Sequence, residues 1–342
     1  MGCNKIKMNS ALAYTLIVFG CVLLLVLVLC LSILGAVGHE LVASTKVKET
    51  VDEAVQKYEA APKLDMTVTL TTVPNRLISG AIKQTLLSLL VQDPAPSEIV
   101  INIPWIMKRK NRIYEIPDYL ANTGIRVRRC KDYGPATKYI PTLQELKAKG
   151  DDDRIVLVMD DDVILPHRDS IKTIYEYAQQ YPDKVVTGQA NYLVDKGTKT
   201  PKFNPITQFI EPKQTIFGFL TQRTSKYVGR KEAYKKADLI LGYQGYVIRP
   251  HMVDLRELMD YDSMPPDAFF VDDVVMSANL AKRHVDRIVV REWPKFRMGA
   301  DMTFFYLKNL YRSSRKDEGL TTTANLDGVH DKVMVEHFAD VW

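Results

Sequence analysis

From Asp65 onward, short runs rich in valine and isoleucine alternate with segments of helical periodicity, and this alternation restricts the possible fold more than any other feature. The sequence predicts strands at residues 67–72, 98–103, 125–129, 155–159 and 184–187. It predicts the intervening helices at residues 78–91, 137–149 and 170–181. Strands connected through helices form parallel sheets with both faces covered. We therefore expect a Rossmann-like α/β fold, with a mostly parallel central sheet and helices on both faces.

The second half of the chain departs from this rhythm. Residues 190–236 carry lysine, threonine, glutamine, aromatic residues and prolines without clear periodicity, which predicts irregular structure or a hairpin built onto the sheet. After them we expect a strand-like stretch at 239–249, a helix at 272–282 and a strand at 287–291. One domain over residues 64–342 accounts for all of these elements.

The N-terminus carries a long apolar run, residues 11–37, which contains no charged residue and no His, Asn or Gln. Its length suffices to cross a hydrocarbon core of about 30 Å, whereas the apolar core of a cleaved signal peptide spans only about 7 to 15 residues. We expect a short tail at 1–10, a single-pass transmembrane signal anchor at 11–37 and a polar stalk at 38–63. A type II orientation with a cytoplasmic N-terminus is favoured, which in a eukaryote means the Golgi or ER.

Bulk composition excludes some classes of protein. The net charge of +5 is mild, and the sequence lacks the clustered basic stripe of a nucleic-acid binder, although a small basic bias suits an anionic ligand such as a nucleotide. Cys130 is the single cysteine after the apolar run, so a disulfide within the domain is excluded. The sequence also contains no Asn-x-Ser/Thr sequon, which leaves the compartment open.

The strongest chemical signal is the apolar run at 155–159, which leads directly into Asp160, Asp161 and Asp162. In open α/β sheets, ligands bind beyond the carboxyl ends of such strands. Adjacent carboxylates repel one another unless a hard cation lies among their oxygens. The pattern predicts a Mg²⁺ or Mn²⁺ site in which the metal also contacts diphosphate oxygens. The alternative is a solvated acidic turn, which is our interpretation of Asp151–Asp153.

With these carboxylates at the end of a central strand, residues 65–294 resemble the metal-dependent glycosyltransferases of the GT-A fold, whose Asp-x-Asp motif occupies this position. The spacing is most similar to the C-terminal catalytic domain of exostosin-type enzymes. The resemblance implies that Asp160 and Asp162 handle the metal and the ribose, with Asp162 favoured as the direct metal ligand. It also places Asp160 and Asp161 among the contacts of a nucleotide-sugar donor.

The resemblance assigns the nucleotide to the first strand and the turn that follows it. Its candidate contacts are Thr71, Thr72, Pro74 and Arg76. Physically, a strand end with free backbone groups followed by an arginine suits a base and a diphosphate. Taken alone, this motif is weak.

A second candidate donor segment is 130–138, a strand end followed by a Gly-Pro turn and a helix start. A helix N-terminus with Lys138 favours an anion, and Asp132 offers an acceptor to a base or a sugar. Turn chemistry explains the Gly-Pro pair equally well, and an exposed helix position explains Lys138.

Asp272 and Asp273 follow Phe269-Phe270-Val271 and open a predicted helix. Acidic residues at a helix start are often caps or partners of the helix dipole. The alternative comes from the resemblance, because GT-A enzymes present an acidic pair to the acceptor here. It implies that Asp273 is the catalytic carboxylate, with Asp272 beside it. Asp273 would act as a base in an inverting enzyme or stabilise positive charge at the sugar carbon in a retaining one.

Other residues are open to two interpretations. Gly242 and Gly245 weaken a predicted strand, which indicates either a bulge or the close approach of another group to the backbone. His330 matches the C-terminal histidine that many GT-A enzymes add to the metal site, but lone histidines are often surface or packing residues. Trp105 and Trp293 suit either a sugar site or the core.

Together these features lead us to expect a membrane-anchored glycosyltransferase of the EC 2.4 class, which transfers a hexose, pentose or N-acetylhexosamine. The expected donor is a nucleotide sugar, with a uridine diphosphate sugar favoured, and the cofactor is Mn²⁺ or Mg²⁺. The acceptor would be a hydroxyl of a glycan, glycoprotein or lipid, and no nucleic-acid partner is expected. Two alternatives remain: a non-catalytic, membrane-tethered Ca²⁺-dependent carbohydrate-binding protein, and a nucleotidyltransferase.

Overall fold

The computed structural model describes residues 18–29, 32, 46–196, 202–207, 226–227, 231–298 and 328–342, and the chain divides into two units at Lys46. In the first unit, residues 18–29 form a helix whose large apolar side chains are 52 to 69% exposed. Among the described residues, no helix combines the length and the apolar character needed to span a membrane. Most of the predicted anchor at 11–37 lies outside the described residues and remains a prediction.

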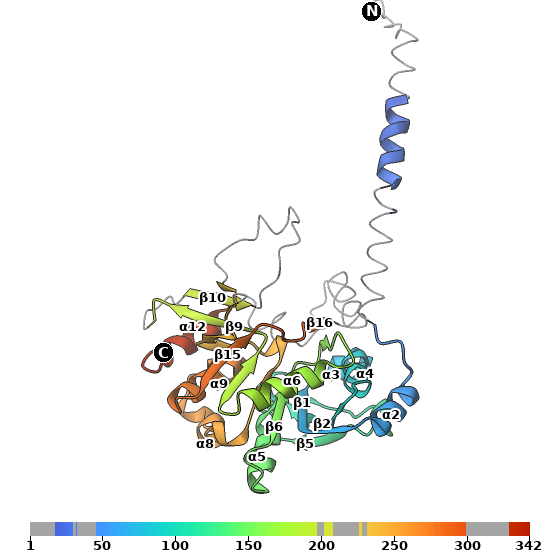
Figure 1. Ribbon diagram of the computed structural model, residues 1–342. Helices are drawn as coiled ribbons and strands as arrows, with labels where there is room; N and C mark the ends of the chain where they lie inside the picture. The colour runs from blue at the N-terminus through green and yellow to red at the C-terminus, as the bar shows by residue number, and fades with distance from the viewer. Residues whose placement is uncertain are drawn as a thin grey trace, which may run out of the picture. The chain divides into compact units, whose positions relative to one another are not determined.

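An eight-stranded sheet forms the centre of the second unit, with the strand order β12-β15-β8-β14-β6-β1-β2-β5 (Figure 1). Only β14 and β12 run against the direction of the other six strands. The predicted α/β class with a mostly parallel sheet is therefore confirmed. The strands are β1 (Lys63–Thr71), β2 (Ala95–Pro104), β5 (Arg126–Cys130), β6 (Ile155–Val158), β8 (Lys184–Thr187), β12 (Tyr234–Ala237), β14 (Tyr246–Ile248) and β15 (Asp286–Val290).

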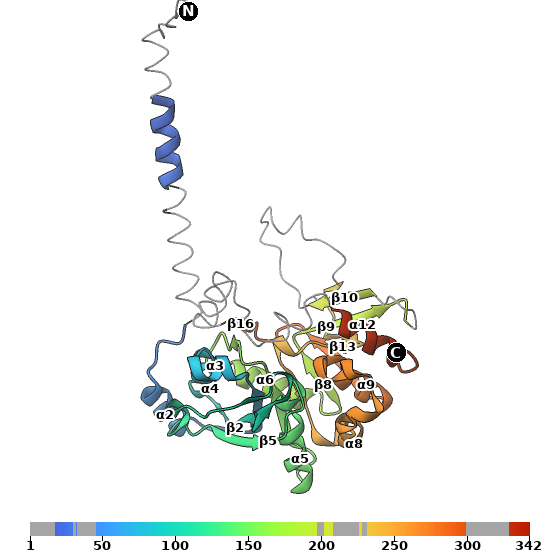
Figure 2. The ribbon, with the colours of Figure 1, turned by 180° about the vertical axis from the view of Figure 1, so that it is seen from behind.

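Helices cover both faces of this sheet. The evidence is that alternate residues of the central strand β6 belong to different hydrophobic clusters. Ile155 and Leu157 of β6 belong to one hydrophobic cluster, whereas Val156 and Val158 belong to another on the opposite face. The first cluster includes residues of α2 (Val51–Ala60), α4 (Lys83–Leu90) and α6 (Ser170–Gln180). The second includes residues of α5 (Ile140–Ala148), α8 (Leu255–Met259), α9 (Asp272–Lys282) and α12 (Val329–His337) (Figure 2).

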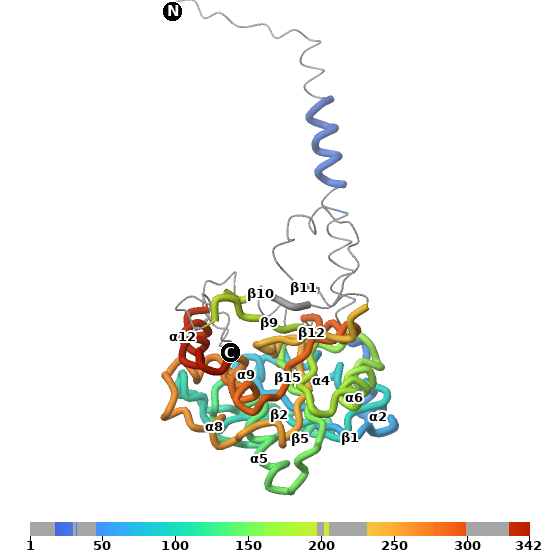
Figure 3. Tube along the Cα trace, turned by 60° about the vertical axis from the view of Figure 1, so that its left-hand side comes forward, coloured from blue at the N-terminus to red at the C-terminus, as the bar shows by residue number. Residues whose placement is uncertain are grey.

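Described residues between 189 and 240 add a second, smaller sheet to the domain. Its order is β11-β10-β9-β13. β9 (Gln189–Val194) and β10 (Lys202–Thr207), both labelled in Figure 3, pair antiparallel. The other two strands are β11 (Lys226–Tyr227) and β13 (Leu239–Ile240). The described residues therefore confirm a hairpin in this segment, but the hairpin belongs to a separate sheet and is not built onto the central one.

The segment predicted as a free stalk is largely part of the domain. Residues 47–62 belong to the second unit, and Ala54 of α2 is completely buried against the core. The Tyr58 hydroxyl donates a hydrogen bond of 3.0 Å to the carbonyl of Pro96. Valines four residues apart form an apolar stripe on this helix, and such a stripe is stabilised by packing on a neighbouring surface. In this structure residues 47–62 therefore pack with the domain, while the domain bounds remain a prediction.

The predicted helix at 78–91 is interrupted. α3 (Pro74–Ser79) ends at Gly80, whose φ of +73° is unfavourable for residues with a side chain, and α4 starts after it. At Gly80 the chain changes direction between α3, which follows β1, and α4, which packs on the sheet. As a result, the turn after β1 carries a short helix of its own.

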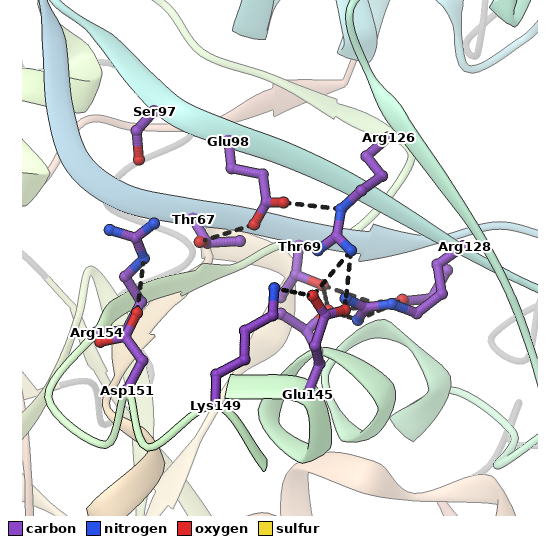
Figure 4. A network of polar contacts seen from close by, with 12 residues as sticks. Thr67, Thr69, Ser97, Glu98, Arg126, Arg128, Glu145, Lys149, Asp151 and Arg154 are labelled. Atoms are coloured by element: carbon purple, nitrogen blue, oxygen red, sulfur yellow. Dashed lines mark hydrogen bonds and ion pairs between the residues drawn. The ribbon is translucent and has the colours of Figure 1, made fainter. Parts of the chain in front are cut away.

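A polar network fixes α5 against the edge of the sheet, as Figure 4 shows. Glu145 of α5 accepts a bond of 2.8 Å from Arg126 and also pairs with Arg128, both on β5. Glu98 of β2 contacts the Arg126 Nε at 2.7 Å. Burial lowers the pKa of the Arg128 guanidinium to about 10, with help from the nearby charge of Arg126. Glu145 is thus the carboxylate that compensates two arginines on one edge strand.

We expect Glu145→Gln to lower the free energy of unfolding by roughly 2 kcal/mol, because it leaves Arg126 and Arg128 partly buried with less compensation. Urea unfolding followed by circular dichroism measures the change. The matched control is Glu176→Gln, since Glu176 is 63% exposed and lies 3.9 Å from Lys172. The control should stay within about 0.5 kcal/mol of the wild type. Equal losses in the two variants would contradict a role for Glu145.

Candidate functional site

A cavity of about 410 Å³ lies where the carboxyl ends of β1 and β6 meet the start of α9. It brings together nearly all residues that the sequence singled out. Those that line it are Thr71, Thr72, Arg76, Asp132, Lys138, Asp160, Asp161, Asp162, Asp272 and Asp273. Pro74, buried at the start of α3, and His330 are not among the lining residues.

The three adjacent aspartates after β6 have different roles. Asp161 is buried, and its two oxygens accept bonds from the Thr72 hydroxyl at 2.5 Å and from Arg76 Nη1 at 2.6 Å. Burial raises the pKa of Asp161, against the opposing effects of Arg76 and Thr72. This carboxylate therefore joins the turn after β1 to the turn after β6. The side chains of Asp160 and Asp162, 31% and 22% exposed, remain accessible from the cavity.

Lys138 lies at the end of the short 3-10 helix η3 (Ala136–Lys138) and connects the two acidic elements. Its Nζ is 2.8 Å from Asp160 Oδ1 and 2.9 Å from Asp272 Oδ2. Burial alone would lower the pKa of Lys138, but Asp160, Asp272 and Asp273 together raise it well above its ordinary value. Lys138 is therefore a buried cation that neutralises carboxylates, and not the exposed helix residue of the alternative interpretation.

Asp273, in the first turn of α9, accepts a hydrogen bond of 2.9 Å from the backbone N–H of Gly242. Its other oxygen is buried and has no hydrogen-bond partner in the part of the chain that the structure describes. Burial, reinforced by the charge of Asp272, raises the pKa of Asp273 to about 8. A carboxyl group in this state exchanges its proton close to neutral pH.

The absence of a side chain at Gly242 makes this arrangement possible. A Cβ there would lie 2.8 Å from Lys138 Nζ and 3.0 Å from Asp273 Oδ1. Of the two sequence interpretations, close approach of another group to the backbone is thus confirmed for Gly242. Gly245 has a φ of +67° and faces Phe296, so its requirement is one of conformation and packing.

Asp132 holds two loops of the cavity wall together. Its oxygens accept bonds of 2.8 Å from the backbone N–H groups of Lys108 and Gly134. Gly134 adopts a φ of +62° and lies so close to the carbonyl of Phe269 that a Cβ would be 2.2 Å from that oxygen. Both oxygens of Asp132 therefore have protein partners already, and the contacts observed are positioning contacts.

The donor set for a metal is small. Within the described ranges, no three His, Cys, Asp or Glu residues are grouped closely enough to hold an ion. Asp160 and Asp162 supply two carboxylates, with Arg76 Nη1 at 3.5 Å from Asp162 Oδ2. Such a pair fits Mg²⁺ or Mn²⁺ when substrate phosphates complete the coordination. The residues present thus fit a hard cation that is shared with a phosphorylated ligand.

The predicted third ligand, His330, is engaged elsewhere. Its Nδ1 lies 2.6 Å from Asp267 Oδ1, and its ring stacks on Phe270 with centroids 4.7 Å apart. These contacts attach the start of α12 to the segment before α9. Packing, the simpler of the two interpretations, accounts for His330 in this structure.

Several lining residues were not predicted from the sequence. They come from the hairpin of β3 (Ile106–Met107) and β4 (Arg112–Ile113) with the residue after it, from the second sheet, from the short 3-10 helix Gly242–Gln244 and from the segment before α9. They include Arg109, Tyr114, Asn191, Phe203, Tyr243 and Phe270. The only sequence signal was the basic run at 108–110, which contributes Arg109. Trp293 is buried and donates to the carbonyl of Gln244 at 2.8 Å, which makes it a core residue. Trp105 is 61% exposed and does not line the cavity.

One solved structure with a similar chain course is that of residues 1–349 of TarS from S. aureus, with 12% sequence identity and a TM-score of 0.36. The match covers 78% of this chain and 74% of the TarS chain in that structure. The mannosyltransferase PcManGT from Pyrobaculum calidifontis, in complex with GDP-Man and Mn²⁺, is similar at 13% identity and a TM-score of 0.39, over 84% and 78% of the two chains. An apo UDP-glucose pyrophosphorylase has 11% identity and a TM-score of 0.39, over 74% and 98%. No protein-family model and no curated protein matches the sequence.

The raised pKa of Asp273 predicts a pH dependence of stability. An unfolded aspartate has a pKa of 3.8, so between about pH 4 and 8 the folded protein holds a proton that the unfolded chain has lost. The contribution of Asp273 to the free energy of unfolding is therefore largest below pH 4 and is lost as the pH rises to 8. Without metal, we expect wild-type stability to fall between pH 5 and 8 by roughly 1–3 kcal/mol more than that of Asp273→Asn.

Urea unfolding of both proteins at several pH values in EDTA tests this expectation. Asparagine keeps an oxygen that accepts from the Gly242 N–H but has no titrating proton. The comparison therefore isolates the effect of the Asp273 carboxyl group. Parallel stability curves for the two proteins would contradict a raised pKa at Asp273.

Proposed function

We propose that this chain is a glycosyltransferase that uses a nucleotide sugar, with a uridine diphosphate sugar favoured, and a divalent metal. One observation carries the proposal: two accessible carboxylates after β6 and a buried acidic pair at α9 face one cavity and are joined by Lys138. The first pair suits a metal-bound diphosphate, and the second suits proton transfer. A carbohydrate-binding protein without turnover has no evident use for the second pair.

The proposed donor site lies at the carboxyl end of β1. Asp160 and Asp162 would hold Mn²⁺ or Mg²⁺, which stabilises negative charge on a leaving diphosphate when it is bound. Arg109, from the β3–β4 hairpin, adds a cation to the same cavity, and Tyr114 adds an aromatic ring suited to a base. Asp132 and Asp161 would position these walls through the contacts described above.

Asp273 is the proposed catalytic carboxylate. In the transfer, the bond between the sugar carbon and the diphosphate oxygen breaks, and a bond from that carbon to the acceptor oxygen forms. The acceptor hydroxyl loses its proton, and a carboxylate with a pKa near 8 is suited to receive it. The Gly242 N–H holds Asp273 in place, while Lys138 pairs with Asp272 and balances part of the charge of the acidic pair.

We further propose that the enzyme is a membrane protein with a type II anchor at residues 11–37. The helix at 18–29 supports the proposal, because its large apolar side chains are exposed and the helix has no polar face. The remaining spacer would be residues 38–46, since the domain starts at Val47. The acceptor would then be a glycan, glycoprotein or lipid hydroxyl within reach of the membrane.

The test incubates the full chain, in detergent micelles, with Mn²⁺ and a panel of nucleotide sugars, and measures released nucleoside diphosphate. We expect turnover with one donor and a loss of at least about 100-fold in Asp162→Asn, because the leaving group loses a metal ligand. Asp183→Asn, on an exposed loop, should keep wild-type activity. Metal-dependent sugar binding without nucleotide release would contradict the proposal and favour a binding protein. Pyrophosphate release from a nucleoside triphosphate and a sugar phosphate would instead indicate a nucleotidyltransferase.

A further inference from the structure

The hairpin of β3 (Ile106–Met107) and β4 (Arg112–Ile113) presents apolar side chains to solvent. Ile106 and Ile113 lie directly opposite each other across the two strands and are 45% and 68% exposed. Trp105, the preceding residue, is 61% exposed. Cross-strand partners lie close together on one side of a hairpin. Ile106 and Ile113 therefore form an exposed apolar pair, with the exposed Trp105 next to it in the chain, and these three residues are here called the hairpin surface.

The hairpin is firmly held, so its exposed side chains are not a sign of a loose loop. On its other side, Met107 and Tyr114 are buried and line the cavity. The Tyr114 hydroxyl donates to the carbonyl of Thr72 at 2.9 Å, and Asp132 accepts from the backbone of Lys108 at 2.8 Å. One side of the hairpin thus completes the cavity, while the other exposes apolar residues at a cost in solvation.

Basic residues accompany the hairpin surface. Residues 105–116 contain four basic residues and one acidic residue, Glu115. Lys108 and Lys110 are exposed at the tip of the hairpin, and the Arg129 guanidinium lies 4.3 Å from the centre of the Trp105 ring. Segments that lie in the interface of an anionic membrane have this composition, with an exposed tryptophan and isoleucines next to lysines.

We propose that the hairpin surface docks on an anionic lipid membrane, with Trp105, Ile106 and Ile113 entering the headgroup region. Lys108 and Lys110 contact the acidic headgroups, and each such charge contributes about five-fold to affinity. The basic residues beside these apolar side chains favour an anionic membrane as the partner. The proposal concerns a second surface of the chain and does not depend on the reaction in the cavity.

The test follows Trp105 fluorescence in the full chain, reconstituted into lipid nanodiscs whose acyl chains are brominated and quench nearby indoles. Subtracting the signal of Trp105→Phe isolates Trp105 from Trp293 and Trp342. We expect strong quenching of Trp105 in nanodiscs that contain phosphatidylserine and several-fold weaker quenching in nanodiscs of phosphatidylcholine alone. Ile113→Gln should weaken the quenching without changing the fold, because this side chain is 68% exposed.

The charge contribution is tested with Lys108→Gln/Lys110→Gln against a matched control, Lys172→Gln/Lys202→Gln. The control lysines are 56% and 74% exposed and lie on α6 and β10. We expect the first pair to lose several-fold in quenching and the control to behave as the wild type. Absence of Trp105 quenching, equal quenching in neutral and anionic nanodiscs, or equal loss in both double variants would overturn the proposal. Since the readout is not turnover, failure here is distinct from failure of the proposed reaction.

Discussion

The ammonium group of Lys138, buried between Asp160 and Asp272, is the interaction on which the rest of the site depends. Carboxylates withdrawn from water repel one another, and an uncompensated buried charge costs several kcal/mol. By pairing with both acidic elements, Lys138 lets the loop after β6 approach the start of α9. Gly242 completes the arrangement, because any side chain there would collide with the lysine or with Asp273. The cavity exists because one cation and one glycine allow acidic residues from distant parts of the sequence to share it.

Much of this architecture could be predicted, because it follows from local pattern. The apolar run of β6 leading into Asp160 predicted a ligand site at the strand end, and the helix expected at 272–282 matches α9. What failed depended on tertiary contacts. The stripe on α2 gave no indication of the surface it covers, and His330 gave no sign that Asp267 and Phe270 would engage it. Sequence spacing identifies which residue types are available but not which partner each one meets.

The three adjacent aspartates illustrate the same distinction at the level of single residues. Asp161 is buried and bonded to the turn after β1, whereas the chemically identical Asp160 and Asp162 are accessible from the cavity. The difference arises because Thr72 and Arg76, from the turn after β1, make two short bonds to Asp161, whereas Arg76 Nη1 stays 3.5 Å from Asp162 Oδ2. A motif of three carboxylates therefore does not imply three ligands. Among the described residues, Asp160 and Asp162 are the two carboxylates of this motif that face the cavity without a bond as short as those of Asp161, and a phosphorylated ligand would supply further oxygens to a metal there.

In the proposed enzyme, the metal and the nucleotide would therefore each strengthen the binding of the other. Electron paramagnetic resonance of free Mn²⁺ measures the affinity of the full chain for the metal, with and without uridine diphosphate. After correction for Mn²⁺ bound by the nucleotide alone, we expect at least about ten-fold tighter binding when the nucleotide is present, a coupling of about 1.4 kcal/mol. The same coupling must appear as tighter nucleotide binding in the presence of Mn²⁺. Equal Mn²⁺ affinity with and without the nucleotide would contradict a shared site at Asp160 and Asp162.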